Sequence, residues 1–305
     1  MKLENDHKSG EMAGLPYAIF TYFIWGIYPL YFKLLQDGHP LEVMAHRVIW
    51  SLPVCLIILQ FRHQMADFIA VFRNWRALRI LIISSLLIAS NWLIYIYAVF
   101  TDHVLAASLG YYLNPLLNVV LATIFLKEQL SRLQIVAVAV AAMGVAILMT
   151  GALDTLWLSA LLATSFAFYG MLRKIMPVPS LPALAVETSV LIPIALSVAV
   201  YFYLTGTGAG FGRDRDLTMW MVLSGVVTAI PLLTFATAAR LMNYVTLGFV
   251  QYIGPTILFL LSLFVFDEPL NRSQLFCFAL IWLSVAIFSY DMWARSKQRV
   301  APPVA

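Results

Sequence analysis

The chain has 305 residues, of which 62% are hydrophobic and 11% are charged. Soluble domains contain about 25% charged residues, so this composition excludes an ordinary soluble protein and predicts an integral membrane protein. The net charge of +4 is not gathered on a soluble basic domain, which excludes a nucleic-acid-binding protein.

Ten apolar segments are long enough, or nearly so, to cross a bilayer as helices of about 20 residues. In chain order they are 15–35, 41–61, 80–100, 104–126, 133–153, 155–172, 181–204, 217–239, 241–266 and 273–290. Residues 1–14 and 293–305 are predicted to be tails, and no signal peptide precedes the first span. The predicted fold class is therefore all-α integral membrane, with ten transmembrane helices.

The distribution of Lys and Arg predicts the orientation of the chain. With the N-terminus in the cytoplasm, fourteen of the 19 Lys and Arg residues lie in cytoplasmic segments, four lie in outer loops, and Arg47 lies within a span. This excess is typical of a membrane protein with both termini in the cytoplasm. Residues 62–79 mix cations with Phe and Trp, and we interpret them as an interfacial amphipathic stretch or, equally, a solvated loop.

The second half of the chain repeats the first. Segment 114–132, NPLLNVVLATIFLKEQLSR, resembles segment 254–272, GPTILFLLSLFVFDEPLNR. At an offset of 140 residues the matches are Pro53 with Pro193, Pro115 with Pro255, Glu128 with Glu268, Leu130 with Leu270 and Arg132 with Arg272. We predict two five-helix repeats, residues 15–150 and 155–292. Because five is odd, the second repeat has inverted topology, which is typical of secondary transporters; an old duplication in a protein that transports nothing is the alternative.

Two charged residues, Arg47 and Glu187, lie inside spans as counterparts at the same offset. From the helical rise they are about 9 and 7.5 Å from opposite surfaces, hence roughly 13 Å apart in depth, and we expect no direct salt bridge. Charges inside a membrane usually face the protein interior or a wet cavity. Arg47 would then attract a substrate carboxylate or phosphate, and Glu187 would meet an amine or take a proton. Alternatively, Arg47 extends to lipid headgroups and Glu187 binds Thr188 or Ser189.

Amides and prolines in apolar spans are further candidates. Asn91, Asn114, Asn118 and Gln251 either hydrogen-bond substrate or join helices. Pro115 and Pro255 occupy matching positions in the fourth and ninth spans, and each removes a backbone donor from its helix. We predict paired kinks that bind ligand or act as hinges, with packing alone as the alternative.

Aromatic residues near these positions would suit a pocket for a small amphipathic molecule. The candidates are Trp25, Trp92, Tyr95, Tyr112, Tyr169 and Tyr252. The alternative is ordinary packing, since 14% of the chain is aromatic.

Other features predict no cofactor. His39, Glu42 and His46 share a helical face, but ordinary helix-start chemistry explains Glu42, and we predict no metal site. Cys55 and Cys277 lie in apolar spans as buried hydrophobes. The Ala- and Gly-rich segment 134–148 predicts a close-packing or homodimer-contact helix, and the Gly-rich loop 205–216 predicts a flexible connection without a function.

Five motifs in this order resemble the RarD branch of the EamA family, within the drug/metabolite transporter superfamily. They are HRVIWS at 46–51, NW at 91–92, ASLGYYLNPLLNV at 107–119, FAFYG with RK at 166–174, and TLGFVQYIGPTILFLL at 246–261. The resemblance covers residues 14–290. It implies two EamA repeats, cytoplasmic termini, a bacterial inner membrane and export of small metabolites, but no defined substrate.

Together these features predict a secondary transporter that exports a small amphipathic, amino-acid-like metabolite by rocking two repeats about a midplane cavity. A proton carried by Glu187 is one candidate for coupling, and uniport is equally allowed. The rival functions are an importer, or a membrane scaffold or sensor. A membrane-embedded enzyme would need an acid, base or nucleophile cluster at one depth, which the spans lack.

Overall fold

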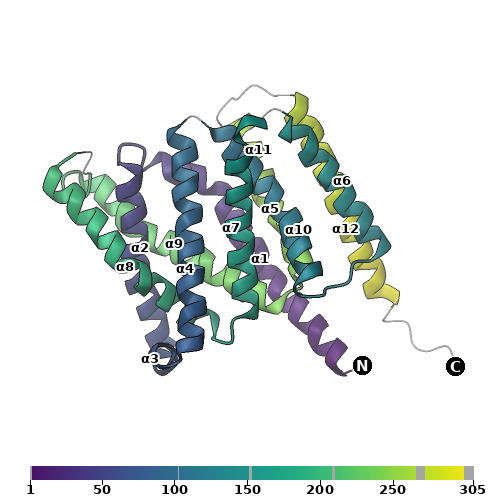
Figure 1. Ribbon diagram of the computed structural model, residues 1–305, viewed down its shortest axis with the longest axis horizontal. Helices are drawn as coiled ribbons and strands as arrows, with labels where there is room; N and C mark the ends of the chain where they lie inside the picture. The colour runs from purple at the N-terminus through teal and green to yellow at the C-terminus, as the bar shows by residue number, and fades with distance from the viewer. Residues whose placement is uncertain (1, 102, 151–152, 208–209, 266–271, 299–305) are drawn as a thin grey trace.

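The computed structural model describes residues 2–101, 103–150, 153–207, 210–265 and 272–298, which are helical apart from short connections (Figure 1). The helices are α1 (Lys2–Lys33), α2 (Pro40–Phe61), α3 (Met65–Arg73), α4 (Trp75–Phe100), α5 (Val104–Ile124), α6 (Arg132–Met149), α7 (Leu156–Ile175), α8 (Ser180–Thr205), α9 (Arg215–Leu241), α10 (Tyr244–Gln251), α11 (Ile253–Phe264) and α12 (Arg272–Gln298). One 3₁₀ turn, Leu153–Thr155, precedes α7.

Nine helical stretches in this part of the chain are long and apolar enough to cross a membrane. One of them, Tyr244–Leu261, combines α10 with α11. The predicted first span, within α1, is not among the nine, because its apolar residues are interrupted by Tyr and by Pro16 and Pro29. It nevertheless packs along α9 and α11. The prediction of an all-α membrane protein is therefore confirmed: nine of the ten predicted spans are among these stretches, and the first packs beside them within α1.

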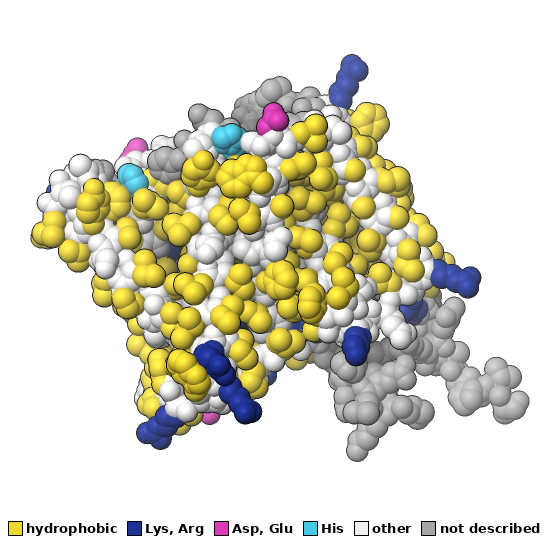
Figure 2. Space-filling model, in the orientation of Figure 1, with side chains coloured by type: hydrophobic (Ala, Val, Ile, Leu, Met, Phe, Trp, Pro, Cys, Tyr) yellow, Lys and Arg dark blue, Asp and Glu magenta, His cyan; other side chains and the backbone are white. Residues whose placement is uncertain are grey.

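The two ends of the helix bundle differ in charge. We call one end the basic face; it carries α3 and the connections that follow α5, α7 and α9, with Arg62, Arg73, Arg76 and Arg79 around α3. The other end, the opposite face, carries the α1–α2, α4–α5 and α8–α9 connections. Figure 2 shows hydrophobic side chains across the middle of the molecule and most of the visible Lys and Arg near its lower edge. This banded surface fits a protein that crosses a bilayer.

Helix contacts repeat between the two halves of the chain. In the predicted repeat, α1, α2, α4, α5 and α6 correspond to α7, α8, α9, α10–α11 and α12. The contacts α5–α7, α1–α9 and α2–α9 have counterparts in α11–α1, α7–α4 and α8–α4, and all six pairs pack together. The pairs α2–α8 and α6–α12 each map onto themselves and also pack. This pattern is that of two repeats related by a pseudo-twofold axis.

One helix breaks this symmetry. Helix α9 packs closely against both α7 and α8. Its counterpart α4 makes no comparable backbone approach to α1 or α2 among the described residues. The bundle is consequently closed between α7, α8 and α9, and looser between α1, α2 and α4.

Glycines allow the closest helix approaches. A Cβ added at Gly225 of α9 would lie 2.3 Å from the carbonyl group of Trp50 in α2, so the two backbones touch at this seam. A Cβ added at Gly144 of α6 would lie 3.1 Å from the Cys277 carbonyl oxygen of α12. The small residues of segment 134–148 therefore pack on α12 within the chain (Figure 1), which accounts for the close-packing alternative.

The two matched prolines sit in different local structures. Helix α5 continues through Pro115. In the ninth span the helix breaks at Tyr252, three residues before Pro255. The helix is therefore continuous at one matched proline and interrupted shortly before the other.

The α8–α9 connection, predicted to be flexible, is hydrogen-bonded to α2 at Gly210 and Phe211. The Glu42 carboxylate of α2 accepts hydrogen bonds from the backbone N–H groups of Gly210 (2.9 Å) and Phe211 (3.3 Å). The Phe211 ring stacks on His46 with ring centroids 4.0 Å apart. The first two turns of α2 thus hold this connection in place through Glu42 and His46.

Candidate functional site

A cavity of about 510 Å³ lies in the looser part of the bundle, between α1, α2, α4 and their neighbours. It reaches the α1–α2 connection at the opposite face, where Leu35, exposed Gln36 and Gly38 line it. Eight of the predicted site residues line it: Trp25, Arg47, Asn91, Trp92, Tyr95, Asn114, Gln251 and Pro255. The cavity therefore opens at the opposite face and collects most of the candidates.

Arg47 lies inside this cavity and does not extend toward lipid. Its side chain is 8% exposed, and its Nε donates to Thr228 Oγ1 of α9 at 3.0 Å. Its guanidinium carbon lies 5.9, 5.3 and 5.1 Å from the ring centroids of Tyr28, Phe32 and Trp92. Such cation–π contacts hold a guanidinium without neutralising it. The alternative in which Arg47 reaches the headgroups is therefore wrong.

The amides of the cavity also join helices. Asn91 donates to the Leu162 carbonyl oxygen (2.8 Å) and to Ser165 Oγ (3.0 Å) of α7. Asn114 donates to the Ala163 carbonyl oxygen at 2.7 Å, also on α7. These bonds tie α4 and α5 to α7.

Asn118, one turn beyond Asn114, completes this amide group. It donates to Gln251 Oε1 (3.1 Å) and to Asn114 Oδ1 (3.3 Å). Because Gln251 belongs to α10, the network links both repeats beneath the cavity. Asn91, Asn114 and Gln251 thus join helices and also line the cavity, so both interpretations describe them.

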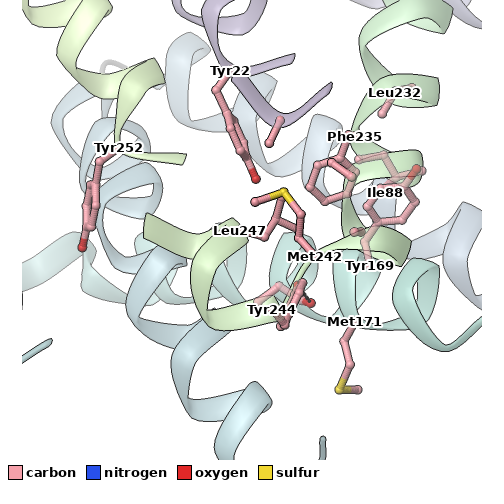
Figure 3. Packing of buried hydrophobic residues seen from close by; sticks show 14 of the residues in the cluster. Tyr22, Ile88, Tyr169, Met171, Leu232, Phe235, Met242, Tyr244, Leu247 and Tyr252 are labelled. Carbon is pink, nitrogen blue, oxygen red and sulfur yellow. Dashed lines mark hydrogen bonds between the residues drawn. The ribbon is translucent and has the colours of Figure 1, made fainter. Parts of the chain in front are cut away.

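Aromatic side chains close the cavity toward the basic face. Tyr22 lines the cavity and is 1% exposed. Figure 3 shows the Tyr22 and Met242 side chains pointing toward one another, with Phe235 alongside and Tyr244 beyond. Tyr169 stacks on Phe235 with ring centroids 5.9 Å apart. These five residues, here called the aromatic floor, are all buried and separate the cavity from the basic face.

Glu187 lies outside the cavity, in the half of the bundle next to the basic face. Its Oε1 forms an ion pair with Arg173 NH1 at 3.3 Å and accepts a hydrogen bond from Ser84 Oγ at 2.5 Å. Thr188 and Ser189 instead donate to carbonyl oxygens of their own helix. The alternative in which Glu187 binds these hydroxyls is therefore wrong. No ion pair joins Glu187 to Arg47 in the described part of the chain, as predicted.

Another carboxylate, that of Glu128, joins helices at the basic face. Glu128, in the α5–α6 connection, accepts hydrogen bonds from the N–H groups of Tyr244 (2.8 Å) and Val245 (3.0 Å). It also lies 3.8 Å from Lys174 Nζ, which donates to the Met242 carbonyl oxygen. A carboxylate at a helix N-terminus satisfies free N–H groups and interacts favourably with the helix dipole. Glu128 therefore acts as a latch that joins the first repeat to α10 and α7.

The remaining predicted site residues do not line the cavity. They are Tyr112, which packs on Phe278 of α12; Tyr169, in the aromatic floor; Tyr252, at the helix break; Glu187, in its ion pair; and Pro115, within α5. For Tyr112 and Tyr252, the packing interpretation describes their surroundings.

Several residues that line the cavity were not among the candidates predicted from the sequence. They include Tyr28, Phe32, Tyr111, Phe166 and Thr228. Tyr28 and Phe32 follow Trp25 by three and seven residues, so helical spacing alone places them on the same face. Thr228 gives no such signal, because its role depends on an α2–α9 contact between residues 181 positions apart.

The described residues contain no group of three or more His, Cys, Asp or Glu side chains that could hold a metal ion. His39 instead caps α2, since its Nδ1 accepts from the Leu41 N–H at 3.2 Å. Cys55 and Cys277 are buried and unpaired with one another.

Comparison with known proteins places this geometry in a family. Residues 12–150 match the model of the EamA-like transporter family. The chain is 42% identical to "Uncharacterized transporter PA0485" of Pseudomonas aeruginosa, covering 95% of this chain and 97% of that protein. It is 38% identical to "Protein RarD" of Escherichia coli, covering 91% and 94%. A crystal structure that is 18% identical has a TM-score of 0.68 and covers 90% of this chain, which shows a shared fold.

Proposed function

The chain belongs to the RarD branch of the EamA-like transporter family, and from this premise we propose that it is a secondary transporter that exports a small amphipathic metabolite by alternating access. Membership makes it a membrane transporter of the drug/metabolite group. Substrate, direction and mechanism are the proposed part.

The observation that carries the proposal is a difference between two repeats that otherwise pack alike: the bundle is closed on one side and loose on the other. The cavity opens at the opposite face, and the aromatic floor and the Glu128 latch close it toward the basic face. Exchanging the two repeats would instead separate α9 from α7 and α8 and bring α4 against α1 and α2. Inverted repeats related by a pseudo-twofold axis allow both of these states, which is the basis of alternating access.

The charge distribution supports an orientation for this cycle. The basic face holds most of the Lys and Arg residues, and the positive-inside rule places such a face in the cytoplasm. In a bacterial inner membrane the observed cavity would then face the periplasm. This conformation would be the one that releases an exported substrate.

The dimensions and lining of the cavity support a small amphipathic substrate. About 510 Å³ falls in the range of small-molecule sites, roughly 300–1,000 Å³. Rings from α1 and α4 supply apolar surface, while Arg47 and Asn91 supply polar contacts. A proton is the candidate coupling ion. To carry it, Glu187 would have to break its ion pair with Arg173 and bind a proton in its place.

The proposal is tested by metabolite profiling of culture medium from overproducing cells at matched membrane levels. Leu258→Trp adds volume at a cavity-lining position, whereas Leu260→Trp, on the same helix, changes an exposed side chain and is the matched control. We expect a compound enriched outside cells with wild type and Leu260→Trp but not with Leu258→Trp. Depletion of a compound from the medium would indicate import, and an unchanged medium would contradict export.

A further inference from the structure

The cavity contains an isolated positive charge. Of the described residues that line it, Arg47 alone is charged, and no carboxylate is among them. The ion pairs of the described chain join Arg173 to Glu187, Lys174 to Glu128 and Arg295 to Asp291, so none involves Arg47. A buried charge without a counter-ion is costly, and proteins keep such a charge mainly where it binds something.

The guanidinium also retains unused hydrogen-bonding capacity. Nε donates to Thr228 Oγ1, and NH1 contacts the Met44 thioether sulfur at 3.2 Å, which is a weak acceptor. A guanidinium has five N–H donors in a planar fork, a geometry that matches a carboxylate through two parallel hydrogen bonds. The three surrounding rings pack around the guanidinium and occupy none of its donors. Arg47 is therefore preorganised for a planar anion.

We propose that the substrate is an organic monoanion whose single carboxylate binds Arg47 and whose apolar or aromatic body lies against the ring-lined wall. This inference rests on the proposed transport function and specifies its substrate class. One cation neutralises one carboxylate, and a second carboxylate in the same cavity would remain unpaired. An organic cation would meet Arg47 with no acidic residue to compensate.

The experiment uses the purified full-length chain in lipid nanodiscs at low salt, with four ligands that share one aromatic body. They are phenylacetate, phenylacetamide, phenethylamine and phenylmalonate, which carry one negative, no, one positive and two negative charges. Binding is followed by Trp fluorescence, because Trp25 and Trp92 line the cavity. We expect phenylacetate to bind at least about ten-fold more tightly than the other three, since charge-assisted hydrogen bonds are the strong ones.

Variants assign this preference to Arg47. In Arg47→Gln we expect phenylacetate to lose at least about ten-fold in affinity, while phenylacetamide changes by about two-fold or less. Arg47→Lys should retain part of the preference, since it keeps the charge but not the planar fork. The control Arg62→Gln, an exposed cation of the basic face, should leave all four affinities unchanged.

Wild-type binding alone can overturn the inference, so it does not depend on the folding of a variant. Equal binding of acid and amide, tighter binding of the amine, or no binding of the acid would each overturn it. Export of a neutral or cationic compound in the culture experiment would also overturn it, while leaving the transport function intact. Arg47-dependent acid binding without any exported compound would support the binding site and contradict export.

Discussion

The buried ion pair between Arg173 and Glu187 predicts a large loss of stability in Glu187→Gln. The two side chains are 1% and 3% exposed and lie 3.3 Å apart. Glutamine keeps an oxygen that can accept from Ser84, so the substitution removes mainly the charge. Arg173 would retain its hydrogen bond to the Ser180 carbonyl oxygen (2.9 Å) but no counter-ion. Breaking a buried pair in this way costs about 3–5 kcal/mol.

The assay is the free energy of unfolding from SDS titration in mixed micelles, followed by circular dichroism. The double variant Glu187→Gln/Arg173→Gln removes both charges and should recover all but about 1 kcal/mol, because no unpaired charge remains. The control is Asp291→Asn, whose partner Arg295 is 41% exposed, and it should cost about 1 kcal/mol or less.

A loss below about 1 kcal/mol in Glu187→Gln would refute the structural interpretation of this pair. If that stable variant also lost pH-driven uptake in vesicles but kept exchange, Glu187 would be the proton carrier instead. Wild-type pH dependence in the folded fraction of Glu187→Gln would remove the carrier role.

Three further predictions concern the closed side and the helix seams. Glu128→Gln should weaken the latch by about 1–3 kcal/mol and increase labelling of Phe235→Cys in the aromatic floor from the basic face; unchanged labelling would show that Glu128 holds nothing closed. Gly225→Ala should lower the free energy of unfolding by about 1–3 kcal/mol and therefore lower the melting temperature. The control Val226→Ala changes an exposed side chain and should not. Equal melting temperatures would argue against a backbone contact between α2 and α9. Glu42→Gln should speed tryptic cleavage of the α8–α9 connection, and an unchanged rate would contradict its anchoring role.

The spans and their duplication could be predicted from the sequence because they depend on composition and spacing along the chain. Apolar windows and one repeated offset are local or periodic properties. An interior position was one of the two alternatives for Arg47, and it is the one that the cost of placing a charge in lipid favours. Asn91 and Trp92 could be predicted as site residues because a polar and an aromatic residue stand side by side within one apolar span, and both line the cavity.

The partners of the charged residues could not be predicted, because pairing depends on the tertiary arrangement. Arg173 precedes Lys174 at the end of a span, where it resembled an ordinary cytoplasmic cation, yet it is fully buried against Glu187. Glu128 was visible only as one member of a repeated motif, and its role requires the N-terminus of α10 beside it. Whether two side chains on different helices meet depends on how the helices pack, which a single sequence does not record.

The contact of Gly225 with the Trp50 backbone constrains which parts of the molecule can move. Two helices whose backbones touch resist sliding or rotation past one another, so we expect α2 and α9 to move together during a change of access. Glu42 and Phe211 add the α8–α9 connection to the same body. Because α2 belongs to the first repeat and α9 to the second, such a moving body would include helices of both repeats. The two repeats of the sequence would then differ from the two rigid bodies that move in the transporter.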